Sequence, residues 1–479
     1  MNAPSPEVAQ SSKNRRVVRR TRAVCPTCLV ELDAMVVVDD RGAVLERTCP
    51  EHGVASQVLS THGDHWAELD GFFFDVNPKP APQRDFIVRM TERCNLDCPI
   101  CLAKANTEDT PDLDLSGLER LLSERRGLKV DLMAAEPTLR DDLEDWVRQV
   151  RDAGHIAALH TNGIRLADRD YVKRLKAAGV EEVFLQFDGF DDDANQALRG
   201  ARLLKRRLKA VENLREEGLA TSLVVVIAGG LNEAQIGETY RFALRPENDH
   251  IREILFLGLR LLGSARDALV RGDGTIGART LMPDDLITEF CAQVEGVDRD
   301  DIRRFNKAYF SLLSAARVRK CLYIQQHLVV RTAAGPRAFG ELVDLERVEA
   351  ACERYRTRFK AGDRLARPRL MASLARCVLR PQTLRAAKDL LRLQDLLRDG
   401  MNLSRVPPRM LLVGFITACD PENWDAGVAA HCGKGELSVD GGYEASGADA
   451  NIARERRFTA SDLRPGALHA WKDRVSPDR

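Results

Sequence analysis

The sequence predicts an α/β protein built around a partial (β/α)6 barrel of the TIM type. A small β-rich metal-binding module precedes the barrel and a mainly helical region follows it. Between about residues 86 and 266, six short apolar runs alternate with longer amphipathic segments, the pattern of parallel βα units. A proline-dense linker, residues 75–85, separates these runs from two cysteine-bearing turns among short alternating strands. A chain of 479 residues is long enough for roughly two to four domains.

Residues 1–22 are polar and rich in arginine, and they lack the apolar core of a secretory signal. We expect a flexible basic terminus there. No later run is long enough to span a bilayer, so we predict a cytoplasmic protein that could touch a membrane only at its periphery. Lys+Arg and Asp+Glu both total 72, so no overall field attracts nucleic acid or anionic lipid. The 12 cysteines favour metal or redox chemistry over disulfides, because the cytosol keeps thiols reduced.

The module predicted at residues 23–74 carries a candidate metal site. Its two turns read CPTC and CPEHG, which gives the spacing C-x2-C followed by C-x2-H. Such a set closes a tetrahedral site for Zn²⁺, or for a single rubredoxin-like iron if the module is redox-active. Metal binding would supply much of the folding energy of so small a module. The alternative is that these cysteines are structural and bind no metal. The four candidate ligands are Cys25, Cys28, Cys49 and His52.

The predicted core, residues 86–275, places polar side chains where its strands end. Helices between the strands end at glycines such as Gly154 and Gly179, in C′ positions. In barrel folds the carboxyl ends of the strands form the working face. Residues at those ends are therefore candidates for chemistry, although each could equally be an ordinary loop-entry residue. The strand-end residues are Glu136, Asn162, Asp188 and Gly229.

Three cysteines follow the first predicted strand in the sequence RCNLDCPICLA. Cys94, Cys98 and Cys101 have the spacing C-x3-C-x2-C, with no fourth cysteine nearby. Thiolates suit iron–sulfur clusters, and three of them on a cubane leave one iron open to a non-protein ligand. A small molecule with an amine and a carboxylate could chelate that iron. The alternative, three structural cysteines grouped by chance, accounts poorly for this spacing and position.

At this motif the sequence resembles the radical SAM superfamily, over roughly residues 86–266. The resemblance implies a [4Fe-4S] cluster on the three cysteines, with S-adenosylmethionine (SAM) bound to the open iron. It also implies that an electron from an external donor, such as flavodoxin or ferredoxin, splits SAM. The resulting 5′-deoxyadenosyl radical would remove a hydrogen atom from an unactivated carbon of the substrate.

The resemblance also assigns site residues. Where the superfamily usually has Gly-Gly-Glu-Pro, this chain has Ala134-Ala135-Glu136-Pro137. Glu136 would accept hydrogen bonds from the ammonium group of SAM. Both glycines are replaced, so we expect any glycine-only backbone angle to be absent here. Asn162 and Asp188 would lie around the ribose and the reacting centre, with purely structural roles as the alternative.

Three features point to one subfamily within this superfamily: the metal-binding module, the sequence CNLDCPIC and the sequence AEPTLRDDL. They resemble the subfamily of archaeal tetraether lipid synthases and pterin methyltransferases. This implies carbon–carbon bond formation or methylation on a lipid or small-molecule substrate. Members of that subfamily carry further cysteine motifs for auxiliary clusters, one just before the core and one near the C-terminus, and the remaining cysteines of this chain contain no paired C-x2-C motif. Its other cysteines are widely scattered in the sequence, at Cys291, Cys321, Cys352, Cys377, Cys419 and Cys432.

The predicted helical region, residues 276–438, should cover the open face of the barrel and shield the radical from solvent. It includes a basic amphipathic stretch that either packs on the barrel or receives a substrate with an apolar body and an anionic head. Residues 439–479 form a glycine-rich polar tail, which we expect to lack regular structure. The arginines of the basic stretch are Arg376, Arg380, Arg385 and Arg392.

Two other classes of function compete with an enzyme. One is a degenerate, non-catalytic metalloprotein that binds a partner, and the loss of both glycines at Ala134 and Ala135 supports it. The other is a nucleic-acid-binding zinc module, suggested by the sequence RRVVRRTR before the first turn. The second alternative ranks last, because clustered aromatic residues are lacking and the three-cysteine motif would have no purpose. We therefore expect no nucleic acid partner.

Overall fold

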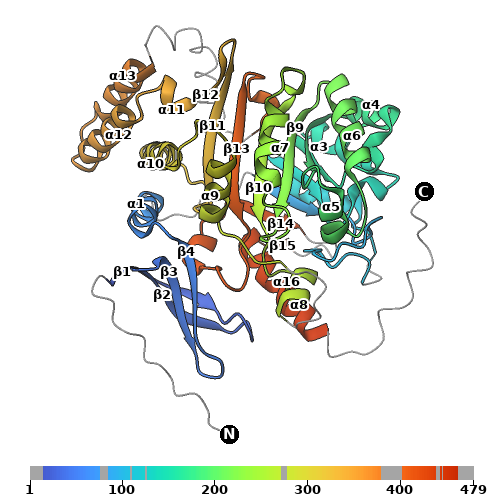
Figure 1. The fold of residues 1–479 in the computed structure, drawn as a ribbon, viewed down its shortest axis with the longest axis horizontal. Coiled ribbons are helices and arrows are strands. Elements are labelled where there is room, and N and C mark those ends of the chain that lie inside the picture. Colours follow the sequence, from blue (N-terminus) through green and yellow to red (C-terminus); the bar gives the residue numbers. More distant parts are fainter. Residues whose placement is uncertain are drawn as a thin grey trace.

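The fold of the chain is seen in a computed structural model, which contains two β-sheets (Figure 1). The ranges that the structure describes are 15–75, 85–107, 111–123, 127–270, 278–378, 402–437, 443–444 and 446–461. Most of the linker predicted at 75–85 therefore lies outside the described residues, as do Arg380, Arg385 and Arg392. None of the described helices is long and apolar enough to cross a membrane.

The N-terminal module is a four-stranded antiparallel sheet with its strands in sequence order. Val36, Leu45 and Leu59 are buried and pack against Trp66 of the following helix, which gives the module a small core. The predicted β-rich module is confirmed. Its elements are β1 (Arg16–Val24), β2 (Glu31–Asp39), β3 (Gly42–Cys49), β4 (Gly53–Ser60) and α1 (Gly63–Phe74).

The six predicted core strands are all present and lie parallel, side by side, in sequence order. Apolar residues on one face, such as Leu132, Leu159 and Phe256, are fully buried in a core shared with helix residues such as Trp146. This confirms the predicted α/β fold. The strands are β5 (Asp85–Arg89), β6 (Lys129–Met133), β7 (Ile156–Thr161), β8 (Val180–Gln186), β9 (Ala220–Ile227) and β10 (Ile251–Gly258).

Helices connect these strands and cover one face of the sheet (Figure 1). Several begin at a side chain that accepts backbone N–H groups, as Asp168 and Asp191 do. The helices are α2 (Leu115–Ser123), α3 (Leu143–Asp152), α4 (Arg169–Ala178), α5 (Asp192–Arg199), α6 (Leu204–Glu216) and α7 (Gln235–Leu244). Three short 3-10 turns accompany them, η1 (Pro137–Leu139), η2 (Arg165–Ala167) and η3 (Pro246–Asn248).

The C-terminal region extends this sheet at both edges, which the sequence did not predict. One strand lies parallel to β10 and another lies parallel to β5, so the described sheet has 11 strands. The leucine periodicity of the region predicts helices, whereas the short apolar run MLLVGFIT forms the strand that pairs with β10. The added strands are β11 (Ile324–Thr332), β12 (Gly335–Ala338), β13 (Met410–Thr417), β14 (Lys434–Leu437) and β15 (Tyr443–Glu444).

The remaining helices gather mainly beyond β11 and β12 (Figure 1). In the described part of the region, η4 (Leu403–Arg405) contacts β8, β9 and β10, and Leu403 donates its N–H to Glu182 Oε2 at 2.5 Å. Helices α10, α12 and α13 pack on one another, and their buried residues share one apolar cluster with Ala158, Phe184 and Ala220 of the sheet. The expectation that this region covers the open face of the barrel stays a prediction. The helices are α8 (Ser264–Val270), α9 (Pro283–Gln293), α10 (Arg299–Ala316), α11 (Phe339–Leu342), α12 (Leu345–Lys360), α13 (Ala366–Val378) and α15 (Ala426–Ala429).

The predicted polar tail contains a helix, α16 (Gly447–Ser461), so the expectation of an unstructured tail was wrong for these residues. Ala448 and Ile452 are buried against Val24 and Trp424. The helix is also held by an ion pair between Arg454 and Glu436, whose Nη2 and Oε1 atoms are 2.5 Å apart. A narrow apolar stripe on a polar sequence is thus enough to dock this helix. Residues 462–479 lie outside the described residues.

Candidate cluster and metal sites

The three-cysteine loop directly follows β5, at the carboxyl end of the parallel strands. Asn106 fixes its start, because its Oδ1 atom accepts the N–H of Cys94 at 2.8 Å and its Nδ2 atom donates to the carbonyl of Cys94 at 3.0 Å. Ser264 donates its N–H to the carbonyl of Cys101 at 2.9 Å, which fixes the other end. The loop is therefore held at both outer ligands.

The three thiols lie in one small cluster of packed residues. Burial, followed by the nearby charges of Glu136 and the other two thiols, raises the pKa of Cys94 well above its ordinary value. Burial likewise raises the pKa of Cys98 to about 11. These thiols would hold their protons at neutral pH unless a metal replaces them, as metal-ligand cysteines do. A bound metal would therefore have to displace the protons of Cys94 and Cys98.

Hydrogen-bond donors surround the sulfur atoms. The N–H of Leu96 lies 3.4 Å from Cys94 Sγ, and the N–H of Ala105 lies 3.4 Å from Cys101 Sγ. The guanidinium of Arg199 lies near Cys98: burial lowers the pKa of Arg199, but the charges of Asp188 and then of Cys98 outweigh it and raise this pKa. Such donors stabilise negative charge on cluster sulfurs. The residues present therefore fit a [4Fe-4S] cluster.

Asp188 lies at the end of β8 and is fully buried. Its Oδ2 atom lies 2.7 Å from Arg199 Nε and 3.3 Å from Arg207 Nη1, and its Oδ1 atom accepts the N–H of Val226 at 3.0 Å. Asp188 therefore positions Arg199 beside Cys98. Its predicted contact with the ribose or the reacting centre stays a prediction, since the structure shows other partners for both oxygens. The sequence did not identify Arg199, because nothing in its local pattern links it to the cysteine loop.

Glu136 and Asn162 join the ends of β6 and β7 beside this loop. The buried carboxylate of Glu136 accepts the N–H of Asn162 at 2.8 Å and the hydroxyls of Thr161 and Thr138 at 2.7 and 2.5 Å. Burial raises the pKa of Glu136. Asn162 Nδ2 donates to Asn95 at 2.8 Å and lies 3.9 Å from Cys94 Sγ. The structure thus brings Glu136, Asn162 and Cys94 together, while their contacts with SAM stay predictions.

The backbone angle φ at Ala134 is positive, although we expected no glycine-type angle at this position. Its φ is +118°, a conformation that glycine adopts easily and alanine rarely does. Hydrogen bonds from the N–H of Ala135 to Thr91 and from the N–H of Glu136 to Arg93, at 3.2 and 3.0 Å, hold the turn in place. The glycine-type angle is therefore kept although both glycines are replaced, and it is kept under strain.

Changing Ala134 to glycine should stabilise the protein. Relief of a strained angle contributes about 1–3 kcal/mol, and the extra freedom of glycine in the unfolded chain removes roughly 0.5–1 kcal/mol. We expect a net gain of about 1 kcal/mol in the free energy of unfolding, measured by chemical denaturation. Ala135→Gly is the matched control and should be neutral or destabilising, since Ala135 has no positive φ. Equal effects of the two variants would contradict the assignment of strain to Ala134.

A second site lies in the N-terminal sheet, where one ligand atom from each of Cys25, Cys28, Cys49 and His52 lies within 4.8 Å of the others. Cys49 Sγ is 3.5 Å from His52 Nδ1 and 3.9 Å from Cys28 Sγ. A hydrogen bond from His52 lowers the pKa of Cys49 to about 6, so this thiol is readily deprotonated. Three thiolates and one imidazole in this arrangement match a closed structural zinc site.

We predict that the full-length protein retains one Zn²⁺ through dialysis. Because the site is closed and tetrahedral, loss of any one ligand should lower its zinc affinity strongly. Cys28→Ser is expected to lose the metal, as read by elemental analysis. Cys291→Ser, on α9, is the matched control. Zinc retained at one equivalent in the Cys28 variant would contradict the assignment.

Three of the remaining cysteines converge in space, although the sequence shows them scattered. Cys321 and Cys419 lie opposite each other, since β11 and β13 pair Ile324 with Ile416 and the N–H of Thr417 reaches the carbonyl of Tyr323 at 3.3 Å. Cys432 follows His431, whose Nδ1 is 3.1 Å from Arg319 Nη1, close to Cys321 in the chain. Burial and then repulsion from Cys321 and Cys432 raise the pKa of Cys419.

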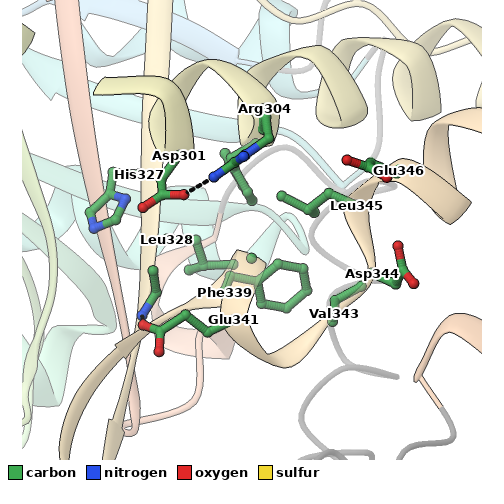
Figure 2. A pocket seen from close by; sticks show the side chains of 13 residues that line it. Asp301, Arg304, His327, Leu328, Phe339, Glu341, Val343, Asp344, Leu345 and Glu346 are labelled. Carbon is green, nitrogen blue, oxygen red and sulfur yellow. Dashed lines mark hydrogen bonds and ion pairs between the residues drawn. The ribbon is translucent and has the colours of Figure 1, made fainter. Parts of the chain in front are cut away.

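A pocket of about 290 Å³ lies away from the cysteine loop, between α10, β11 and α11 (Figure 2). Figure 2 shows Asp301, Arg304 and Phe339 around it, with a contact between Asp301 and Arg304. His327 also lines it and is almost fully buried. None of its lining residues belongs to the loop of Cys94–Cys101 or to the zinc site. It is therefore separate from both metal sites.

Comparison with known families identifies two domains in the chain. Residues 88–243 match the family model described as the radical SAM superfamily. The chain contains a radical SAM domain. Residues 17–61 match the model of the HMPTM N-terminal zinc ribbon domain. These domains confirm the predicted cofactors, which are a [4Fe-4S] cluster, SAM and zinc. The first match spans Cys94, Cys98 and Cys101 and the second spans the four candidate zinc ligands, and the roles of these residues as ligands stay predictions.

Relatives of this radical SAM domain differ in function. The chain is 29% identical over 288 residues to 7,8-dihydro-6-hydroxymethylpterin dimethyltransferase of Methanocaldococcus jannaschii, covering 54% of this chain and 56% of that protein. It is 27% identical over 165 residues to a probable GTP 3′,8-cyclase of Pyrococcus abyssi, covering 34% and 53%. The chain thus spans about half the length of these relatives. Among solved structures, Streptococcus suis SuiB bound to S-adenosylmethionine shares 16% identity with a TM-score of 0.35, over 57% of this chain and 77% of that chain.

Proposed function

We propose that this radical SAM protein methylates, or forms a carbon–carbon bond at, an unactivated carbon of a small polar substrate such as a pterin. The observation that carries the proposal is the cysteine loop at the strand ends, with Arg199 and Asn162 beside its sulfur atoms. The pterin methyltransferase among the relatives supports the type of reaction. An external one-electron donor, such as flavodoxin or ferredoxin, would serve it.

The cluster and SAM, when bound, supply a one-electron cleavage and the removal of a hydrogen atom. The side chains of the protein would hold the cluster and exclude water from it. Cys94, Cys98 and Cys101 hold three positions and leave one open. Apolar residues packed on the cysteines, Leu96 and Leu203, exclude water from the site.

Charged side chains on the inner face of the sheet favour a polar substrate rather than a lipid chain. Asp131 is fully buried there, 2.6 Å from Lys434 Nζ and 3.2 Å from His160 Nε2. The imidazole of His160 stacks on Phe184 with ring centroids 4.3 Å apart. The His160 side chain is 22% exposed and that of Lys434 is 42% exposed, so both can meet a ligand. A hydrocarbon chain placed here would desolvate charged groups without pairing them, which is costly.

An assay that compares the two classes of substrate tests the proposal. Protein reconstituted anaerobically with iron, sulfide, SAM and a reductant is incubated with a dihydropterin or with an isoprenoid phospholipid in vesicles. We expect 5′-deoxyadenosine and a methylated or coupled product with the pterin. His160→Ala should lower product formation while leaving iron content unchanged. Product formed from the lipid and not from the pterin would overturn the polar-substrate proposal and favour the lipid alternative.

The alternative function is a non-catalytic metalloprotein that binds a partner. Its main support was the replacement of the two glycines, and the retained backbone angle at Ala134 weakens that support. Cleavage of SAM separates the two functions, because a degenerate protein would bind the cluster without forming 5′-deoxyadenosine.

The converging thiols Cys321, Cys419 and Cys432 predict a second cluster for this enzyme. Thiolates near one another repel unless a metal neutralises them, and soft thiolates favour an iron–sulfur cluster. We expect more than four irons per chain after reconstitution, falling to about four when all three become serine. The matched control changes Cys291, Cys352 and Cys377 instead. Iron content that is equal in the wild type and the first variant would contradict the prediction.

A further inference from the structure

The turn that carries two zinc ligands is bound to the rest of the protein through its carbonyl groups. Arg266 Nη2 donates to the carbonyls of Pro26 and Thr27, at 2.8 and 3.2 Å, which are the two residues between Cys25 and Cys28. The carbonyl of Leu29 accepts from Arg456 Nη2 at 2.9 Å. Bound zinc would fix the conformation of this turn. Arg266 can therefore donate to the carbonyls of both Pro26 and Thr27 only while the turn keeps that conformation.

Arg266 belongs to α8, and the start of this helix touches the cluster loop. The N–H of Ser264 donates to the carbonyl of Cys101 at 2.9 Å. Glu455 of α16 accepts the N–H of Gly263 at 2.6 Å and lies 3.4 Å from Arg266 Nη1. Figure 1 shows α8 and α16 together below the large sheet. A short run of direct contacts thus connects the zinc turn to a cluster ligand.

The contact at the cluster end is tight. Gly263 has a φ of +55°, and a Cβ atom there would lie 2.3 Å from the carbonyl oxygen of Cys101 and 2.6 Å from that of Leu102. Lys104, three residues after Cys101, forms an ion pair with Asp267 of α8 at 2.7 Å. A shift of α8 would therefore displace the cluster loop, because the packed backbones leave no room for one to move alone.

We propose that Arg266 is a positioning residue through which the occupied zinc site holds the [4Fe-4S] cluster in place. Zinc fixes the carbonyls of Pro26 and Thr27, these hold Arg266, and α8 then holds the backbone at Cys101. The inference concerns retention of the cluster and does not depend on the substrate or reaction proposed above. Coupling between two sites is reciprocal at equilibrium, so the cluster should strengthen zinc binding by the same factor.

The test measures loss of the cluster in the full-length protein without SAM or substrate. Anaerobic holoprotein is mixed with an iron chelator, and the decay of the visible cluster absorbance is followed. Four proteins are compared: the wild type, Cys28→Ser to empty the zinc site, Arg266→Gln, and the double variant. Arg206→Gln, at an exposed position on α6, is the matched control.

We expect each single variant to lose its cluster about 5-fold faster or more than the wild type, the lower end of common coupling strengths. The double variant should lose it no faster than the faster single variant, because both changes break the same connection. A purely structural role of Arg266 would instead multiply the two effects. Arg206→Gln should behave as the wild type.

Two results would overturn the proposal. One is equal decay in the wild type and Cys28→Ser, and the other is multiplied effects in the double variant. If Arg266→Gln does not fold, Glu455→Gln replaces it, since Glu455 holds both Arg266 and Gly263. Zinc affinity gives a second readout, and it should fall when Cys94, Cys98 and Cys101 are changed to alanine. Zinc affinity unchanged in that variant would also count against the coupling.

Discussion

Changing Cys94, Cys98 and Cys101 together to alanine is expected to abolish both the [4Fe-4S] cluster and the cleavage of SAM. These are the only thiols that the described loop offers, and soft thiolates are the ligands that iron–sulfur clusters take. The variant should lose the iron, sulfide and brown absorbance of this site, and 5′-deoxyadenosine should fall below detection. Its far-ultraviolet circular dichroism should stay close to that of the wild type, because the loop has no regular structure of its own.

The matched control for this variant changes Cys291, Cys352 and Cys377 to alanine. These thiols lie on α9, α12 and α13, away from the cysteine loop. The control should keep its SAM cleavage. If the first variant still cleaves SAM with the iron content of the wild type, the assignment of the site to this loop is wrong.

Asp188→Asn is expected to give the largest loss of stability among single substitutions at the site. The carboxylate is fully buried between Arg199 and Arg207, and both guanidiniums are themselves buried. Removing its charge leaves two buried cations without their partner, which typically costs about 3–5 kcal/mol. We expect a fall of that size in the free energy of unfolding, measured by urea denaturation. The cluster should also be lost more readily, because Arg199 would no longer be fixed beside Cys98.

Asp193→Asn provides a matched control in the next helix. Asp193 pairs with Arg202 on the surface, where both side chains are mostly exposed. Exposed pairs contribute about 0–1 kcal/mol, so this variant should unfold almost as the wild type does. Equal effects of the two substitutions would mean that the buried pair contributes no more than a surface pair.

The sequence predicted those features that depend on local pattern. The six core strands are apolar runs bounded by turns, and Cys94, Cys98 and Cys101 follow the first of them directly, so periodicity and spacing identified both. The helix α16 was missed because its apolar stripe is narrow, and its stability comes from Val24 and Trp424, which are distant in the sequence. The added strands β11–β15 were missed because strand pairing with the core is a tertiary event.

The residues of the candidate site also divide into those that the local sequence pattern identifies and those that only the folded structure brings together. Glu136 and Asn162 could be named from their places at strand ends. Arg199 could not, because its role depends on the ion pair with Asp188 and on a thiol from another loop. The convergence of Cys321, Cys419 and Cys432 was likewise hidden, since the chain must fold before these positions meet. The angle at Ala134 was predicted wrongly, because surrounding hydrogen bonds impose a conformation that alanine alone would avoid.

The pairing of β14 with β5 has a consequence for how the protein is made on the ribosome. In this pairing Lys434 lies opposite Asp85. The outer edge of the first core strand, β5, therefore stays uncovered until one of the last segments of the chain has been translated. Until then its free N–H and C=O groups can recruit strands from other nascent chains. Such long-range closure is also intrinsically slow. Nascent chains that stop before Lys434 would therefore expose this edge permanently and would be prone to aggregate.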